Sequence, residues 1–175
     1  MQVFFWSSGV TIALFFAVWA VTPLLFGWIS LLLPDRWLEP KLPLWRARRW
    51  ERDGRFYERV FRIKSWKHLL PDGGAFFQKR GYKKRNLNDY SEDNLRRFLI
   101  ESARAELMHW LAISPFWVFG LFAPGYVIWI MLAYALAFNL PCILAQRYNR
   151  PRIHALLSRL YPNSRNMHSA SEGEQ

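Results

Sequence analysis

Hydrophobic residues in this 175-residue chain form two long blocks, and a charged segment separates them. The first block, residues 4–33, runs for thirty residues without a charged side chain. A helix that crosses a bilayer needs roughly 20 mostly apolar residues, so this block predicts a transmembrane helix that Pro23 and Gly27 bend without ending it. The block is too long for the hydrophobic part of a signal peptide and lacks a basic start, so we expect the helix to be retained.

The second block, residues 111–145, also contains no charged residue and is interrupted once, at Ala123-Pro124-Gly125. Proline removes a backbone donor there, and glycine allows the φ angle of a tight turn. Two apolar arms joined by such a turn predict a transmembrane helical hairpin over residues 104–152. Its two polar edges then lie on the same side of the membrane.

The distribution of charge predicts the orientation of these helices. Residues 34–106 hold 19 Lys and Arg against 11 Asp and Glu, and residues 146–175 hold 5 against 2. Positively charged flanking segments stay in the cytoplasm, so we predict the N-terminus outside and the C-terminus inside. The predicted fold class is an all-α integral membrane protein with three transmembrane helices. A net charge of +11 beside apolar spans indicates contact with anionic lipid headgroups and not with nucleic acid.

Four regions follow from these patterns: a first transmembrane helix (1–33), a cytoplasmic interfacial region (34–103), the hairpin (104–152) and a cytoplasmic tail (153–175). Within the second region, residues 44–67 interleave basic and aromatic side chains at helical spacing. This pattern predicts an amphipathic helix on the inner leaflet, with Gly54 as its weak point. Ser91, followed by two acidic residues, predicts the N-cap of the helix that enters the hairpin.

Two pairs of side chains are candidates for acid–base chemistry. In Glu106-x-x-His109 the two residues share a helix face where the chain enters the bilayer, and ionisable residues there usually face a polar cavity. We expect His109, oriented by Glu106, to act as general base. His68 and Asp72 flank a predicted turn and are the competing base, or a pair that stabilises an oxyanion and positions the acceptor. In the alternative, Glu106 and His109 form a polar collar, and Asp72 caps backbone N–H groups.

The polar edge after the hairpin is rich in guanidinium groups, whose forked donors suit phosphate. With basic residues on the same side, these groups are expected to hold the phosphates of an acyl donor. Asn139, beside Pro141 in an apolar arm, is expected to bond a carbonyl freed by the proline or another helix. The candidate substrate-binding residues are Lys64, Trp66, Lys67, Arg104, Asn139, Gln146, Arg147, Tyr148, Asn149, Arg150 and Arg152.

Metal chemistry and cysteine chemistry have weaker support in the sequence. The four residues of the two acid–base pairs would make a mononuclear metal site if they converged, but a di-iron site needs a second Glu-x-x-His motif, and the chain has one. The single cysteine, Cys142, lies in an apolar arm and excludes a disulfide framework. We expect it to be a buried packing residue.

Several motifs resemble one known family in order and spacing over residues 34–155. They are Glu51-x-x-Gly54-x-Phe56, Trp66-Lys67-His68 with Asp72-Gly73, Arg104-Ala105-Glu106-Leu107-x-His109-Trp110, and Asn139-x-Pro141 followed by Gln146-Arg147-Tyr148-Asn149-Arg150-Pro151-Arg152. The chain is similar to the glycosyl-4,4′-diaponeurosporenoate acyltransferases of staphyloxanthin-type carotenoid biosynthesis.

The resemblance implies transfer of a fatty acyl chain to a sugar hydroxyl of a glycosylated carotenoid, or of a related glycolipid, in a bacterial inner membrane with the active face cytoplasmic. Acyl-CoA or an acyl carrier protein would be the co-substrate, with no other cofactor. Membrane lipid and a second copy of the chain are the remaining expected partners. Two alternatives stay open from the residues alone: a non-catalytic anchor or assembly protein that binds anionic lipid, and a metal-dependent membrane oxidase.

Overall fold

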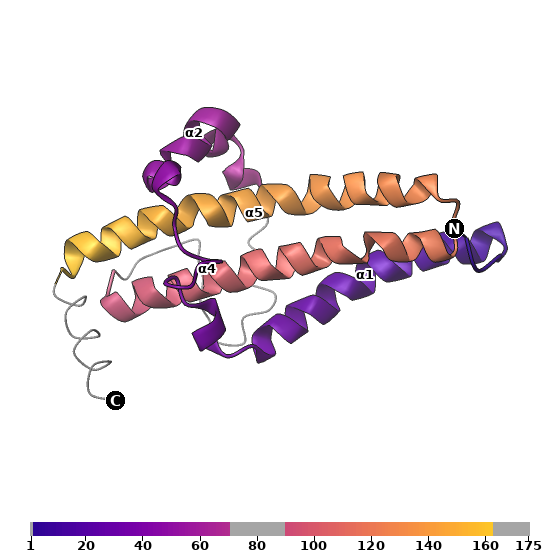
Figure 1. Ribbon diagram of the computed structural model, residues 1–175, viewed down its shortest axis with the longest axis horizontal. Helices are drawn as coiled ribbons and strands as arrows, with labels where there is room; N and C mark the ends of the chain where they lie inside the picture. Colours follow the sequence, from indigo (N-terminus) through magenta and orange to yellow (C-terminus); the bar gives the residue numbers. More distant parts are fainter. Residues whose placement is uncertain (1, 71–89, 163–175) are drawn as a thin grey trace.

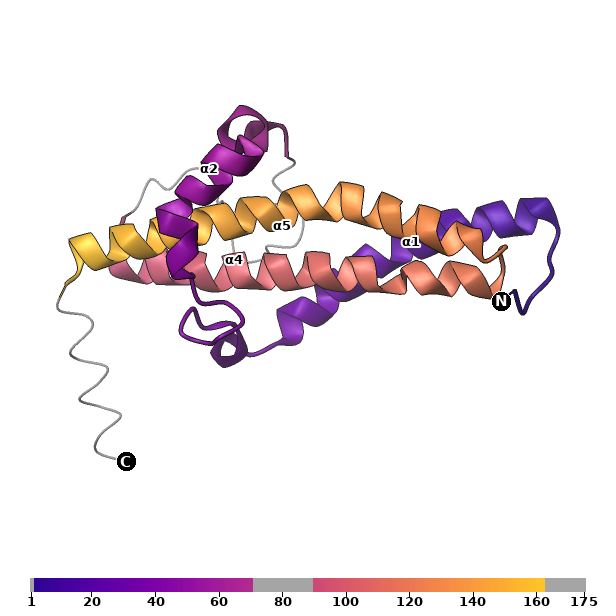
Figure 2. The ribbon, with the colours of Figure 1, turned by 45° about the horizontal axis from the view of Figure 1, so that its top comes forward.

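The computed structural model describes residues 2–70 and 90–162, and no strand occurs among them. Three long helices lie side by side: α1 (Ser8–Leu32), α4 (Glu92–Ile113) and α5 (Tyr126–Leu160) (Figure 1). A second view shows that α1 crosses the α4–α5 pair at an angle (Figure 2). The all-helical fold class is thus confirmed.

The length of α1 and α5 suits a bilayer. At ~1.5 Å per residue, the 25 residues of α1 extend over about 38 Å. Pro23 lies inside this helix and does not end it, as predicted. The 35 residues of α5 extend over roughly 52 Å, well beyond the ~30 Å of a hydrocarbon core, so its polar C-terminal third projects past the apolar part. Of the helices in the described part of the chain, α1 and α5 are long and apolar enough to cross a membrane.

The arm that precedes the Pro-Gly turn differs from the prediction of one continuous helix. α4 ends at Ile113, and the chain continues as the 3-10 helix η5 (Ser114–Leu121) before it reverses direction. Pro115 explains the change, because its ring has no N–H to donate to the preceding turn of α4. The backbone N–H groups of Val3 and Phe4 both donate to the Leu121 carbonyl at 2.8 Å, which ties the start of the chain to this end of the hairpin.

Residues 44–67 do not form the single amphipathic helix that their periodicity predicts. The described part of the chain between α1 and residue 70 consists of short pieces: η1 (Asp35–Leu38), η2 (Arg49–Gly54), α2 (Arg55–Phe61), η3 (Ile63–Ser65) and η4 (Lys67–Leu69). Asp53, Gly54 and Arg62 have φ angles of 55°, 91° and 49°, and such left-handed residues end right-handed helices.

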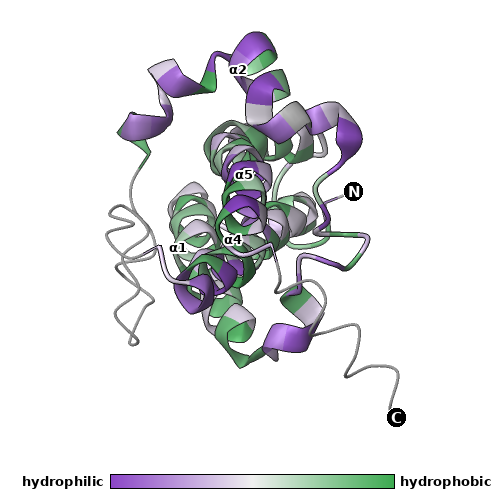
Figure 3. Cartoon of the chain, turned by 90° about the vertical axis from the view of Figure 1, so that its left-hand side faces the viewer, coloured by the Kyte–Doolittle hydropathy of each residue, from purple (hydrophilic) through white to green (hydrophobic). Residues whose placement is uncertain are grey.

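Gly54 also brings the interfacial region close to α5. A Cβ atom at this position would lie 3.0 Å from Cδ2 of Tyr148 and 3.1 Å from two carbons of Arg152, so a side chain here would require these neighbours to move. Seen from the end where α5 finishes, hydrophilic residues mark the α2 segment and the near ends of α4 and α5 (Figure 3). The α2 segment, the start of α4 and the end of α5 therefore lie at the same end of the molecule.

Candidate active site

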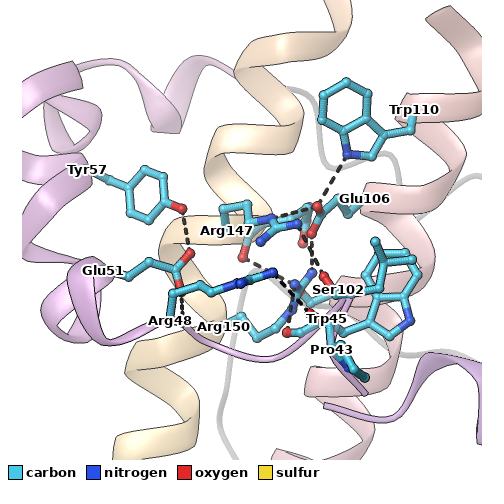
Figure 4. A network of polar contacts seen from close by, with 12 residues as sticks. Pro43, Trp45, Arg48, Glu51, Tyr57, Ser102, Glu106, Trp110, Arg147 and Arg150 are labelled. Carbon is cyan, nitrogen blue, oxygen red and sulfur yellow. Dashed lines mark hydrogen bonds and ion pairs between the residues drawn. The ribbon is translucent and has the colours of Figure 1, made fainter. Parts of the chain in front are cut away.

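The carboxylate of Glu106 is the centre of a buried ion-pair network between α4 and α5 (Figure 4). Its Oε1 accepts from Nε of Arg147 at 2.6 Å, and its Oε2 accepts from Nη2 of Arg150 at 2.5 Å. Trp110 Nε1 donates to Oε1 at 3.3 Å. The Glu106 side chain is fully buried, so water does not solvate its charge. The two guanidinium groups compensate this charge instead.

The two arginines also fasten the loop that precedes η2. Arg147 Nη2 donates to the Leu44 carbonyl at 3.3 Å, and Arg150 Nη1 donates to the Trp45 carbonyl at 3.2 Å. The guanidinium carbon of Arg150 lies 5.7 Å from the centre of the Trp45 ring, within the range of a cation–π contact. The network thus joins three segments that are far apart in the sequence.

A second buried carboxylate, Glu51, supports the same loop, and the analysis of the sequence missed it. Its Oε1 accepts from the Tyr57 hydroxyl at 2.6 Å, and its Oε2 accepts from the backbone N–H of Arg48 at 2.5 Å. Burial raises the pKa of Tyr57 above its usual range, and the hydrogen bond to Glu51 raises it further. Only its place in the motif Glu51-x-x-Gly54 marked this residue in the sequence.

These contacts change the expectation for Arg147 and Arg150. Both were predicted to hold donor phosphates, but each pairs with Glu106 and donates to a loop carbonyl. Arg150 is 2% exposed, so its charge does not face solvent. Glu106 is the partner that compensates this charge. The physical reason is that a buried guanidinium requires a carboxylate close by. Both arginines therefore belong to this network, and donor binding by either of them stays a prediction.

His109 has a different partner from the one predicted. Nδ1 of its half-buried ring lies 3.0 Å from Oδ1 of Asn139 on α5. The two oxygens of Glu106 accept from Arg147, Arg150 and Trp110, so the expectation that Glu106 orients His109 is corrected. The expectation that Asn139 bonds another helix is confirmed, although the carbonyl it reaches in its own helix is that of Ala135 and not the one that Pro141 frees.

The Asn139 amide fixes the tautomer of the neutral His109 ring. Asn139 Nδ2 donates to the Ala135 carbonyl at 2.9 Å, which leaves Oδ1 as the atom that faces His109. A carbonyl oxygen only accepts, so Nδ1 of His109 carries the proton. Nε2 is then the acceptor nitrogen of the ring, which is the form that a general base requires.

A separate basic cluster surrounds the Tyr148 ring on the outer side of α5. Lys67 Nζ and the Arg152 guanidinium carbon each lie 4.8 Å from the ring centre, and the hydroxyl donates to Glu58 at 2.8 Å. Lys64 pairs with the same carboxylate at 2.8 Å. The hydrogen bond from Lys64 lowers the pKa of Glu58, and the one from Tyr148 lowers it further. Burial lowers the pKa of Lys67, and the neighbouring Arg152 and Lys64 add to this effect.

Arg104 forms a third group, at the end of α1. Its Nη1 donates to the carbonyls of Ser30 and Leu33, the latter at 3.1 Å, and its Nη2 pairs with Asp35 at 2.5 Å. The carboxylate of Glu101 lies 3.4 Å from its Nε. The predicted phosphate-binding residues thus lie in three separate groups, and Arg104 joins α1 to α4.

The remaining candidates lie around these groups. His68 is exposed on η4, and Asp72 lies outside the described residues, so their pairing stays a prediction. Trp66 Nε1 donates to the Phe61 carbonyl at 2.9 Å, and Asn149 is half-buried on α5. The backbone carbonyl of Gln146 accepts from the Ser102 hydroxyl at 3.4 Å. Within residues 2–70 and 90–162, no three His, Cys, Asp or Glu side chains are grouped closely enough to hold a metal ion.

Comparison with known proteins places the chain in one family. The profile of the glycosyl-4,4′-diaponeurosporenoate acyltransferases matches residues 34–159. A protein of that name from Staphylococcus aureus (strain USA300) is 34% identical over 139 residues, which cover 79% of this chain and 83% of the relative. Another from Staphylococcus haemolyticus (strain JCSC1435) is 41% identical over 104 residues, 59% of this chain and 60% of the relative. No solved structure matches the chain. The chain is an acyltransferase and belongs to the glycosyl-4,4′-diaponeurosporenoate acyltransferase family.

Proposed function

We propose that this enzyme transfers a fatty acyl chain from a thioester donor to a sugar hydroxyl of a glycosylated carotenoid or a related glycolipid. The relatives' name supports the class of acceptor. A thioester is the donor of choice because its carbonyl is reactive and its thiolate leaves readily. The acceptor hydroxyl attacks the carbonyl carbon, the new ester forms, and the thiolate departs.

The observation that carries the mechanism is the His109–Asn139 pair. An ionisable side chain at the depth of an apolar helix is costly and usually serves function. Asn139 lies eight residues before Arg147 on α5, which is about 12 Å along the helix axis. The pair therefore lies below the basic end of the molecule, at a depth that a membrane-embedded acceptor can reach more readily than a soluble sugar.

His109 moves the proton in this mechanism. Nε2 removes the proton from the attacking hydroxyl, and the resulting imidazolium returns it to the departing thiolate. Asn139 acts as a positioning residue, because its amide oxygen holds the Nδ1 proton and thereby keeps Nε2 free of one. A general base at this step contributes typically about 10²- to 10⁴-fold in rate. His68, exposed on η4, remains the competing base.

Exposed aromatic residues near Asn139 offer a surface for hydrocarbon chains. Phe138 and Tyr134 are 64% and 43% exposed, and their ring centres lie 4.5 Å apart. Large exposed apolar groups on a long apolar helix suit contact with acyl and polyene chains. We propose that these chains lie along this face of α5 while the reacting groups meet at His109.

The proposed topology places the basic end of the molecule in the cytoplasm. The start of the chain and the hairpin turn both lie at the opposite end of the molecule. The turn, Ala123-Pro124-Gly125, contains no charged side chain. The basic segments then follow the preference of Lys and Arg for the cytoplasmic side. We propose three membrane crossings, with α4 and η5 together forming the second, in a bacterial inner membrane.

The test is mass spectrometry of lipid and pigment extracts from cells that make the glycosylated acceptor, with and without the enzyme. We expect a species heavier by one acyl group in cells with the wild type and its loss with His109→Ala. The matched control is His154→Ala, which removes an exposed histidine near the end of α5 and should preserve the product.

Protein from each strain is compared by circular dichroism to establish that the variants fold. Full product with both His109→Ala and His68→Ala would refute a histidine base. Wild-type cells with confirmed acceptor and no acylated product would refute the proposed acceptor.

A further inference from the structure

The loop between η1 and η2 carries a basic pocket that takes no part in the proposed mechanism. The pocket has a volume of about 320 Å³ and is lined by Pro43, Arg46, Arg48 and Arg49. All three arginines are exposed, and no carboxylate from residues 2–70 or 90–162 belongs to the lining. Three like charges around one hollow repel one another unless an anion lies between them. This charge arrangement favours an anionic ligand.

The backbone that carries these arginines is held in place from several sides. The backbone N–H groups of Trp45 and Arg46 both donate to the Leu42 carbonyl, at 3.0 and 2.8 Å. Glu51 accepts from the Arg48 backbone, and the Arg48 side chain donates from Nη2 to the Pro43 carbonyl at 3.4 Å (Figure 4). Leu44 and Trp45 lie between Pro43 and Arg46 in the sequence, and their backbone carbonyls accept hydrogen bonds from the buried network. A ligand that binds here meets a preorganised loop and loses less affinity to ordering.

Arg46 and Arg49 differ from the arginines of α4 in having no acidic partner among the described residues. Arg96, Arg97 and Arg104 on α4 each pair with an acidic side chain. Arg46 and Arg49 make no ion pair with the described residues. Their side chains line the pocket, and no described residue accepts a hydrogen bond from their guanidinium groups. Forked guanidinium donors match the oxygens of phosphate.

We propose that the pocket of Pro43, Arg46, Arg48 and Arg49 binds the phosphate group of a ligand. Two candidate ligands carry a phosphate group. One is a nucleotide-type thioester donor, an acyl-coenzyme A, whose use rests on the proposed function. The other is an anionic phospholipid of the membrane. Both present phosphate oxygens to guanidinium groups, so the recognition chemistry is the same. If the donor is the ligand, its phosphate lies on this loop and not at Arg147 and Arg150, which pair with Glu106.

The experiment uses the full-length protein in nanodiscs and compares two double variants of equal charge change. The pocket variant is Arg46→Gln with Arg49→Gln. The control is Arg55→Gln with Arg59→Gln, which removes two exposed arginines of α2 outside the pocket. Calorimetric titration with coenzyme A in phosphatidylcholine nanodiscs measures donor binding. Native mass spectrometry after reconstitution with phosphatidylglycerol measures retained anionic lipid.

We expect the pocket variant to lose about tenfold or more in affinity for one of these two probes, and the control to change less than about threefold. Loss of coenzyme A binding assigns the pocket to the donor, and loss of phosphatidylglycerol alone assigns it to a lipid headgroup. Equal behaviour of the two variants with both probes would overturn the proposal, since only the general charge would then matter.

The acyl-transfer assay separates this proposal from the mechanism. If His109→Ala abolishes product while the pocket variant binds both probes like the control, the pocket proposal fails and the mechanism stands. If the pocket variant loses binding while both histidine variants stay active, the pocket stands and the mechanism fails.

Discussion

Glu106→Gln tests whether the buried network between α4 and α5 stabilises the fold. The change keeps the shape of the side chain but removes the charge that faces Arg147 and Arg150 at 2.6 and 2.5 Å. The side chain of Arg150 is 3% exposed, so its guanidinium would keep a positive charge away from water with a carbonyl and an amide as partners. Removal of one partner from a buried ion pair costs about 3–5 kcal/mol of the free energy of unfolding.

Equilibrium unfolding in mixed micelles, followed by tryptophan fluorescence and circular dichroism, measures this loss. Glu92→Gln is the matched control on the same helix, because its pair with Arg96 is partly exposed at 32% and 36%. A pair of this kind contributes below about 1 kcal/mol. We expect the Glu106 variant to unfold at a clearly lower denaturant concentration than the control.

A second variant excludes a merely local packing defect. Replacing all three charged partners, with Glu106→Leu, Arg147→Met and Arg150→Met, leaves no unpaired charge, and such apolar replacements are often neutral or stabilising. It should recover much of the stability that Glu106→Gln loses. A loss below about 1 kcal/mol in Glu106→Gln would refute the role of the network in stabilising the fold.

Three further outcomes follow from individual contacts. Tyr57→Phe should cost about 1–3 kcal/mol at neutral pH, because it leaves the buried Glu51 oxygen without its donor. The folded state raises the pKa of Tyr57, so the free energy of unfolding of the wild type should fall above pH ~10, by about 1.4 kcal/mol per pH unit relative to that variant. Parallel curves of this free energy against pH would contradict the raised pKa. Gly54→Ala should cost at least about 1–2 kcal/mol in an unfolding titration, from its φ of 91° and the clash with Tyr148, and an unchanged midpoint would refute this packing. Asn139→Ala should lower kcat for acyl transfer while leaving KM unchanged and should shift the pH profile through His109; an effect on KM alone would contradict its positioning role.

Much of the helical architecture follows from the sequence because the signals are local. Thirty uncharged residues and a Pro-Gly break specify a first helix and a hairpin, and Ser91 marks the start of α4. The interfacial region was predicted less well. Its aromatic and basic periodicity indicates one helix, but the left-handed conformations at Asp53 and Arg62 occur at residues that are not glycine, so the sequence does not mark them.

The candidate site shows the same division between local and long-range information. The sequence places Glu106 and His109 on the same face of one helix, which makes them natural partners. The structure gives each a partner on α5 instead: arginines 41 and 44 residues away for Glu106, and Asn139, 30 residues away, for His109. Such pairing depends on the register between α4 and α5, which no spacing within a single helix specifies.

The measurement that tests the central claim most directly is the rate of acyl transfer by purified enzyme in nanodiscs that contain the glycosylated acceptor. Wild type, His109→Ala, His68→Ala and His154→Ala are compared at equal amounts of folded protein. We predict that His109→Ala alone loses about 10²-fold or more in kcat. Undiminished turnover by His109→Ala would contradict the assignment of His109 as the general base.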